Sequence, residues 1–287
     1  MKLIVSHLTR YEYDQEVSYS PHLLYMRPRD SALLRVNHFH FNISPDAKII
    51  WSRDPLDNLL AWAHFWERSA TLSIRTEFEV ETLDTNPFDF ILKTHAFTAP
   101  FEYEPIHKFH LAPYLAPPFD NTQISLRNWL DEHFVDRPKE TIPYLIALNS
   151  LVHQSLTYNR RDEIGIQPSL TTLALGTGSC RDYAVLFVEL CRTLGFAARF
   201  VSGYLYVPEP NPESVASNAM HAWAEVYLPG AGWKGLDPTN GTFCDEHFIP
   251  VAHGAIAESV NPIQGSYYAP DPVPSKLGHN IIVEQGS

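Results

Sequence analysis

The chain has 287 residues, of which 45% are hydrophobic and 19% are charged, and its formal net charge is −12. This composition is typical of a folded globular protein, and the length leaves room for two domains. The negative charge argues against a nucleic-acid partner, because phosphate binding needs clustered lysine and arginine. No apolar run approaches the ~18 residues of a membrane-spanning helix, so no membrane partner is expected.

The first fourteen residues, MKLIVSHLTRYEYD, are typical of a strand rather than of a signal peptide, because the apolar run is short and no cleavage-like site follows it. The chain has three cysteines, too few for a disulfide framework at this length. Together these features predict a protein of the reducing cytoplasm.

Alternating apolar and polar residues predict strands in the first third of the chain. Residues 72–80 alternate in this way, and residues 38–43 place Phe39, Phe41 and Ile43 on one face. Residues 48–65 resemble a hairpin, with turn-forming residues at 54–58. We therefore expect an N-terminal antiparallel β-sandwich domain over residues 1–85.

Residues 86–121 predict an irregular connector, because prolines interrupt every periodic run. The prolines are Pro87, Pro100, Pro105, Pro113, Pro117 and Pro118. The remaining residues, 122–287, are expected to form the catalytic core with a C-terminal extension.

Helical periodicity begins after the connector. Residues 122–135 are amphipathic, with Asn121 or Thr122 as a candidate N-cap. Thr141 is expected to cap a second helix, which has Pro143 in its first turn. Its apolar positions recur at helical spacing: Leu145, Leu148, Val152 and Leu156.

Two further helices surround a glycine-rich turn. A short helix is expected from Ser169 to Gly176, and an almost entirely apolar helix from Cys180 to Gly195. Period-two patterns follow at 197–207, at 221–237 and at 280–284, with a polar loop at 208–218. Helices followed by antiparallel strands predict an α+β fold for the chain.

Cys180 is the candidate nucleophile. It stands where the glycine-rich turn enters a helix, and unpaired N–H groups and the helix dipole at that end favour a thiolate. A buried structural cysteine is the alternative, and it is the interpretation that we adopt for Cys191 in the middle of the same helix.

His221 and Asp237 are the candidate base and orienting acid, on the two strands of a predicted hairpin. If Leu228 paired with Trp233, the two side chains would lie on opposite faces. If Leu228 pairs with Gly232 around a three-residue loop, they become diagonal neighbours on one face, and we predict this register.

Other interpretations exist for these positions. Asp237 precedes a proline and could simply form an Asx turn. Asp182, in the first turn of the Cys180 helix, is expected to complement the helix dipole. Glu225 lies four residues from His221 along one strand, roughly 13 Å away.

Several motifs in this order resemble a known family. GTGSCRDYA (176–184), LGFAARFVSGYL (194–205) and HAWAEVYLPGAGWKGLDPTNG (221–241) resemble the transglutaminase-like superfamily. More closely, they resemble the bacterial transglutaminase-like cysteine proteases. HLTRYEYDQEVSYSPHLLYMRPR (7–29) resembles the β-rich domain that precedes the core in that group.

The resemblance implies a papain-like core of helices packed on an antiparallel sheet. It also implies a triad of Cys180, His221 and Asp237 that acts on peptide or glutamine-type amides through a thioester intermediate. A peptide or protein substrate and no cofactor are therefore expected. Hydrolysis, cross-linking to an amine and a non-catalytic peptide-binding role all remain open.

A metal site at Cys244 and His247 is an alternative hypothesis for the C-terminal part of the core. One C-x-x-H pair lacks the two further ligands of a structural zinc site. We therefore expect no metal ligand in the chain.

Overall fold

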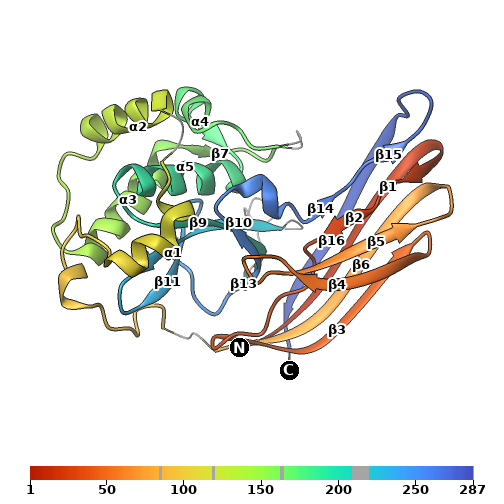
Figure 1. Ribbon diagram of the computed structural model, residues 1–287, viewed down its shortest axis with the longest axis horizontal. Helices are drawn as coiled ribbons and strands as arrows, with labels where there is room; N and C mark the ends of the chain where they lie inside the picture. Colours follow the sequence, from red (N-terminus) through yellow and green to blue (C-terminus); the bar gives the residue numbers. More distant parts are fainter. Residues whose placement is uncertain (84–85, 118–119, 162–164, 209–219, 287) are drawn as a thin grey trace.

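The computed structural model describes residues 1–83, 86–117, 120–161, 165–208 and 220–286. Figure 1 shows two parts side by side, a mixed helix and sheet part and a part built from long strands. The fold is α+β, as the sequence predicts, and its sheets are antiparallel apart from one two-residue parallel pair. The polar loop expected at 208–218 lies outside the described residues, apart from Pro208.

The strand-rich part contains two facing sheets. In the first sheet, β1 (Lys2–Tyr19) pairs with β6 (Ser69–Thr82), and β6 pairs with β3 (Leu34–Ser44). The second sheet has the order β14 (Ile263–Gln264), β2 (His22–Leu24), β5 (Leu59–Phe65) and β4 (Ala47–Arg53). The predicted N-terminal sandwich is therefore present.

The alternation that predicted these strands separates buried from exposed side chains. On β6 the inward residues Leu72, Ile74, Phe78 and Val80 are at most 2% exposed. The expected hairpin is also confirmed, because β4 pairs with β5 from Ala47 and Phe65 to Arg53 and Leu59. Its turn is held by Asp54, whose Oδ1 accepts the backbone N–H of Leu56 at 2.8 Å.

The end of the chain returns to this sandwich. β16 (Ser275–Gln285) pairs with β1 from Leu3 and Gln285 to Tyr13 and Ser275, and β15 (Tyr267–Tyr268) pairs with the end of β1. β14 pairs with β2 in the second sheet. The C-terminal extension therefore completes the N-terminal sheets, whereas the domain limits at residues 85 and 121 stay predictions.

The connector is more regular than its prolines suggested. It contains the 3₁₀ turn η1 (Thr94–Ala96) and the helix α1 (Pro105–Leu115). Pro105 occupies the first helical position, where a missing N–H costs nothing. Pro113 lies within the last turn of α1, so it did not prevent the helix.

Among its described residues, the core has four helices beside a five-stranded sheet. The helices are α2 (Asp120–His133), α3 (Thr141–Ser155), α4 (Ser169–Leu175) and α5 (Cys180–Thr193). The strands follow the order β12 (Thr242–Phe243), β11 (Gly232–Asp237), β10 (His221–Leu228), β9 (Ala198–Leu205) and β13 (Phe248–Gly254). α5 and α3 contact the sheet, and α2 and α4 pack on α5. The smaller elements are β7 (Thr157–Tyr158), β8 (Thr177–Gly178) and the 3₁₀ turn η2 (Ala257–Val260).

Two helix starts differ from the predictions. α2 begins at Asp120, so Asn121 and Thr122 both lie inside the helix and neither is its cap. Thr141 is the first residue of α3, so its N-cap is Glu140. The Thr141 hydroxyl does not cap the helix and instead donates to the carbonyl of Ala96 at 2.7 Å. The apolar stripe of α3 is confirmed, since Leu145, Leu148, Val152 and Leu156 are all buried.

Part of the first sheet of the sandwich packs against β9 and β13 of the core. Leu3, Val5 and Phe78 share a hydrophobic cluster with Tyr204 of β9 and Ile249 of β13. The sandwich and the core are therefore one packed unit. No helix of the described residues is long and apolar enough to cross a membrane.

Candidate active site

Cys180 is the first residue of α5 and is 8% exposed. The preceding turn works as the sequence predicts, because Gly176 has a φ of 63° and ends α4. Gly178 leaves room for the helix start, since a Cβ there would lie 2.9 Å from Cβ of Asp182. The nucleophile candidate therefore lies at a helix N-terminus, where backbone N–H groups have no intrahelical acceptor.

Asp182 does more than complement the dipole of α5. Its side chain is fully buried, and Arg161 donates from Nη1 to both carboxylate oxygens at 2.8 Å. The carboxylate also accepts the backbone N–H of Gln167 at 2.7 Å and the N–H and Oγ–H of Ser179, each at 2.8 Å. Burial alone would raise the pKa of Asp182, but these donors lower it. Sequence reasoning did not find Arg161, because nothing local links it to α5.

Replacing Arg161 with methionine should lower the free energy of unfolding by about 3 kcal/mol, because it leaves a buried carboxylate without its cation. A folded-state pKa below the unfolded value stabilises the fold above the unfolded pKa and loses that effect as the pH falls. The deficit should therefore shrink between pH 7 and pH 4, where protonation removes the unpaired charge. Urea unfolding at several pH values measures this loss of unfolding free energy. The control is the double variant Arg161→Met with Asp182→Asn, which has no carboxylate to leave unpaired. A full deficit in the double variant would contradict this account.

The β10–β11 hairpin has the predicted register. Leu228 pairs with Gly232 around the loop 229–231, and Ala224 pairs with Leu236. His221 and Asp237 therefore lie on the same face of the sheet, and His221 Nε2 is 2.7 Å from Asp237 Oδ2. Both side chains are fully buried.

Asp237 is held by the residues that follow it. Its Oδ2 accepts Nδ2–H of Asn240 at 2.7 Å, and its Oδ1 accepts the backbone N–H of Thr239 at 2.9 Å. The second bond is an Asx turn, so the two interpretations of Asp237 are compatible. Burial would raise the pKa of Asp237, but His221, Asn240 and Thr239 lower it. The carboxylate therefore stays charged beside the imidazole.

Asn149 of α3 fixes the backbone at the same place. It is 1% exposed, and its Nδ2 donates to the carbonyl oxygens of Asp237 at 3.3 Å and Thr242 at 3.1 Å. Sequence reasoning missed Asn149 and Asn240. A polar residue next to the apolar stripe of α3 was the available signal for Asn149.

The free nitrogen of His221 is Nδ1. It is buried and has no hydrogen-bond partner among the described residues. Burial alone would lower the pKa of His221, but the charge and hydrogen bond of Asp237 and the neighbouring Cys180 thiol raise it to about 10. The imidazole is therefore protonated at neutral pH, and it can stabilise a thiolate next to it.

Residues 130–238 match the transglutaminase-like superfamily, and residues 3–81 match the bacterial transglutaminase-like N-terminal region. The core of the chain is therefore transglutaminase-like, and the region before it is that of the bacterial group. The β-rich N-terminal region that the motif at 7–29 predicts is likewise confirmed.

Relatives match this transglutaminase-like chain along most of its length. Uncharacterized proteins of Mycobacterium bovis and Mycobacterium tuberculosis are 29% identical to it over 278 residues, which are 92% of this chain and 87% of theirs. A crystal structure from Cytophaga hutchinsonii, described as that of a putative cysteine protease, has a TM-score of 0.75 and 17% identity. That match covers 100% of this chain and 92% of the other, and it shows the shared fold.

Residues of the sandwich, as well as residues of the transglutaminase-like core, pack around Cys180. Cys180 shares a hydrophobic cluster with Ala184 of α5 and Ala222 of β10, but also with Tyr25 and Leu60 of the sandwich. The N-terminal region therefore supplies part of the apolar surroundings of the thiol.

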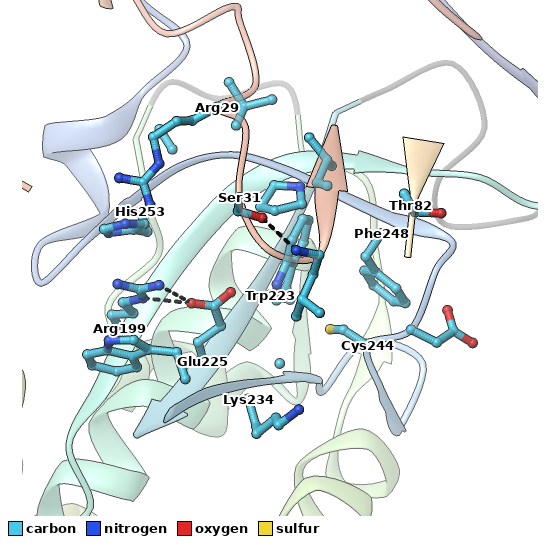
Figure 2. Close-up of a pocket in the computed structure, with 18 of the residues that line it drawn as sticks. Arg29, Ser31, Thr82, Arg199, Trp223, Glu225, Lys234, Cys244, Phe248 and His253 are labelled. Atoms are coloured by element: carbon cyan, nitrogen blue, oxygen red, sulfur yellow. Dashed lines mark hydrogen bonds and ion pairs between the residues drawn. The ribbon is translucent and has the colours of Figure 1, made fainter. Parts of the chain in front are cut away.

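A pocket of about 240 Å³ lies behind the candidate base, between the sandwich and the core sheet (Figure 2). Trp223 and Phe248 line it, and both rings also pack against His221, with centroids 6.2 and 6.1 Å away. Glu225, the alternative acid, faces this pocket and pairs with Arg199 at 2.6 Å. Neither Cys180 nor His221 lines the pocket, so it is separate from the candidate active site.

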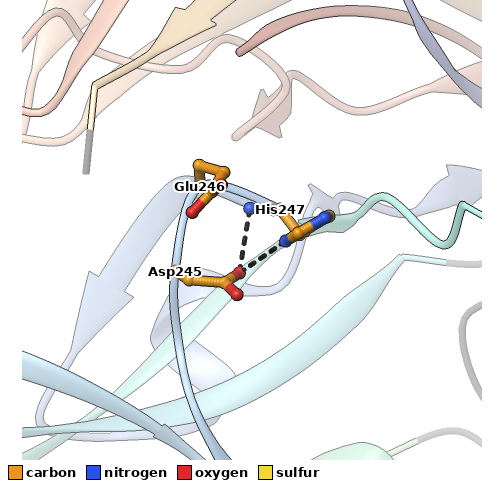
Figure 3. Close-up of side chains that lie close together, drawn as sticks. All are labelled: Asp245, Glu246 and His247. Carbon is orange, nitrogen blue, oxygen red and sulfur yellow. Dashed lines mark hydrogen bonds and ion pairs between the residues drawn. The ribbon is translucent and has the colours of Figure 1, made fainter. Parts of the chain in front are cut away.

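The C-x-x-H pair does not form a ligand cluster. Within the described part of the chain, the group that could hold a metal ion is Asp245, Glu246 and His247, without Cys244 (Figure 3). His247 Nδ1 is 2.8 Å from Asp245 Oδ1. Cys244 instead packs against Gly235, where a Cβ would lie 2.8 Å from its sulfur.

Proposed function

We propose that the chain catalyses thiol-dependent acyl transfer on peptide or glutamine-type amides, with hydrolysis as the main outcome. The observation that carries this proposal is the buried hydrogen bond between His221 Nε2 and Asp237. This bond leaves the other ring nitrogen of His221, Nδ1, available to the neighbouring Cys180 thiol. Cys180, His221 and Asp237 act as nucleophile, proton carrier and orienting acid in this proposal.

In the first step the Cys180 thiolate attacks the amide carbonyl carbon, and the C–N bond breaks to give a thioester. His221 gives its Nδ1 proton to the leaving amine, while Asp237 holds the ring through Nε2. The backbone N–H of Cys180 at the start of α5 is one donor to the developing oxyanion.

In the second step the now neutral His221 removes a proton from water, which attacks the thioester carbonyl. The C–S bond breaks, the carboxylic acid leaves, and the thiolate and imidazolium are restored. A primary amine in place of water would give a new amide, which is the cross-linking alternative. A chain that binds peptides without reacting is the non-catalytic alternative.

Profiling the purified chain against a peptide library, with and without an added primary amine, distinguishes these outcomes. We expect free acids as the main products, with amine adducts a minority at about 10 mM amine. Mass spectrometry of the products measures the ratio, and heat-denatured protein is the control. Predominant amine adducts would favour the transferase. No product, together with no reaction of Cys180 with iodoacetamide at neutral pH, would favour a binding module.

A further inference from the structure

The pocket behind His221 is suited to hold water. Its volume of about 240 Å³ is room for several water molecules, and Arg199, Glu225 and His253 are among the residues that line it. Nδ1 of His253 is buried and has no hydrogen-bond partner among the described residues. Burial and the nearby guanidinium of Arg199 lower the pKa of His253 to about 4, so its ring is neutral at pH 7. An ordered water is the usual partner of such a buried polar atom.

Two aromatic rings lie between this pocket and the candidate base. Trp223 and Phe248 both line the pocket (Figure 2), whereas the fully buried side chain of His221 does not. The indole of Trp223 is stacked on the imidazole of His221, with 28° between the ring planes and 6.2 Å between the centroids. The centroid of the Phe248 ring is 6.1 Å from that of the imidazole and 5.3 Å from that of the indole. We call Trp223 and Phe248 the aromatic wall.

The sheet leaves room for the indole of Trp223 next to the imidazole. Gly203 of β9 is the direct partner of His221, and a Cβ there would lie 2.7 Å from Cη2 of Trp223. A side chain at position 203 would therefore displace the indole, and glycine admits it. A Cβ on Gly235 of β11 would lie 3.6 Å from Nε1 of the same ring. The indole, which is 1% exposed, therefore spans the face of the sheet from β11 to β9 over two glycines.

The ionisable groups that act on His221 come from two elements. They are Asp237 on β11 and Cys180 on α5, and both raise the pKa of the imidazole. From β9 and β13 the imidazole meets uncharged neighbours, Gly203 and Phe248. The protonated imidazole therefore depends on its attraction to Asp237 and to the Cys180 thiolate.

Water beside the imidazole would weaken two opposed effects on its pKa. Burial lowers the pKa of His221, while Asp237 and Cys180 raise it, and the pKa in the folded chain is about 10. A higher local dielectric reduces the penalty of burial and the attraction between charges together. The pKa would therefore return toward the ordinary histidine value of about 6.5. Excluding water from the imidazole keeps it protonated.

We propose that Trp223 is a positioning residue, whose indole keeps the water of the pocket away from the ion pair of His221 and Asp237. This inference rests on the proposed function, in which Nδ1 of His221 carries the proton that the leaving amine receives. In this role Trp223 acts through the imidazole and contributes no atom to the reaction. The alternative is that Trp223 only fills space between the sandwich and the core.

Replacing Trp223 with leucine in the full-length chain tests the inference, because leucine stays apolar but leaves part of the aromatic wall open. The pKa of His221 is measured by NMR titration of its imidazole C–H signals, which comparison with His221→Gln identifies. We expect this pKa to fall by about 1 to 2 units in Trp223→Leu. The alkaline limb of kcat/KM for a cleaved library peptide should move down by the same amount, with little change in KM.

Trp233→Leu is the matched control. Trp233 lines the same pocket from β11, but its ring packs against Tyr114 and Tyr227. Its replacement should leave the pKa of His221 and the alkaline limb unchanged. Trp223→Phe, which keeps an aromatic ring against the imidazole, should keep most of the wild-type pKa. If Trp223→Leu does not fold, Phe248→Leu removes the other ring of the aromatic wall, and the pKa of His221 should then fall by at least about 0.5 unit.

An unchanged pKa of His221 in a folded Trp223→Leu, or in Phe248→Leu where that variant replaces it, would overturn the inference. An equal shift in Trp233→Leu would also overturn it, because the aromatic wall would then have no special role. If the pKa falls as expected but the wild-type chain cleaves no peptide, the role of Trp223 stands and the proposed chemistry fails. If the wild-type chain cleaves peptides and the pKa of His221 does not depend on Trp223, the chemistry stands and this inference fails.

Discussion

Replacing Cys180 with alanine should abolish turnover of peptide amides and labelling of that position by iodoacetamide. Removing the nucleophile of a comparable triad costs about 10⁶-fold in turnover. Cys244 is an unsuitable substitute, because burial raises the pKa of its thiol well above the ordinary value. Cys191 is fully buried in the middle of α5, and burial raises the pKa of its thiol above the ordinary value. The measurement is the initial rate on a cleaved library peptide, with labelled positions mapped by mass spectrometry.

Cys191→Ala is the matched control for that experiment. Cys191 lies on the same helix as Cys180, and its replacement also removes one thiol group. The Cys191→Ala variant should keep both turnover and labelling at Cys180. Full activity in Cys180→Ala, or its loss in a well-folded Cys191→Ala, would contradict the assignment of the nucleophile.

Replacing Asp237 should have the second largest effect, because it removes the charge that keeps His221 protonated. With Asp237→Asn, burial still lowers the pKa of His221 and only the neighbouring Cys180 thiol still raises it, so that pKa should fall well below its wild-type value. The thiolate then loses its neighbouring cation. We expect turnover at pH 7 to fall about 10⁴-fold, and the rate of alkylation of Cys180 at pH 7 to fall with it.

Stability should respond to the same pair in a defined pH window. In the folded wild-type chain the pKa of His221 is raised to about 10. Its contribution to stability is therefore complete below pH ~6.5 and is lost as the pH rises toward 10. Asp237→Asn should remove this slope from the unfolding free energy between pH 7 and pH 10. Asp245→Asn is the control, because Asp245 pairs with His247 at the surface of the core. A slope that persists in Asp237→Asn would contradict the assignment.

Local sequence determined much of the candidate site. The hairpin loop Pro229, Gly230 and Ala231 closes with Gly232, and both glycines have positive φ values of 93° and 74°. Such conformations are easy for glycine and costly for other residues, so the loop favours the three-residue register. The sequence alone left two registers open, and we predicted this one because it places His221 and Asp237 on one face. The glycine conformations now account for it.

Other parts of the site had no local signal. Arg161 reaches Asp182 across a stretch of 21 residues, and Asn149 reaches the carbonyl of Asp237 across 88. A hydrogen bond between distant residues leaves no periodicity in either segment. Sequence patterns indicate the local backbone conformation and the buried face of an element. They do not indicate which distant residue will form a hydrogen bond with it.

The sequence by itself determined the α+β class, most of the strands and helices but not α1, and the helix start at Cys180, because these depend on side-chain alternation, caps and turn residues. Only the tertiary structure decided that β16 returns to pair with β1 and that Tyr25 and Leu60 enter the cluster around Cys180. The physical reason is that pairing and packing between distant segments depend on which surfaces meet. An alternating strand fits many partners, and the assembled fold selects one.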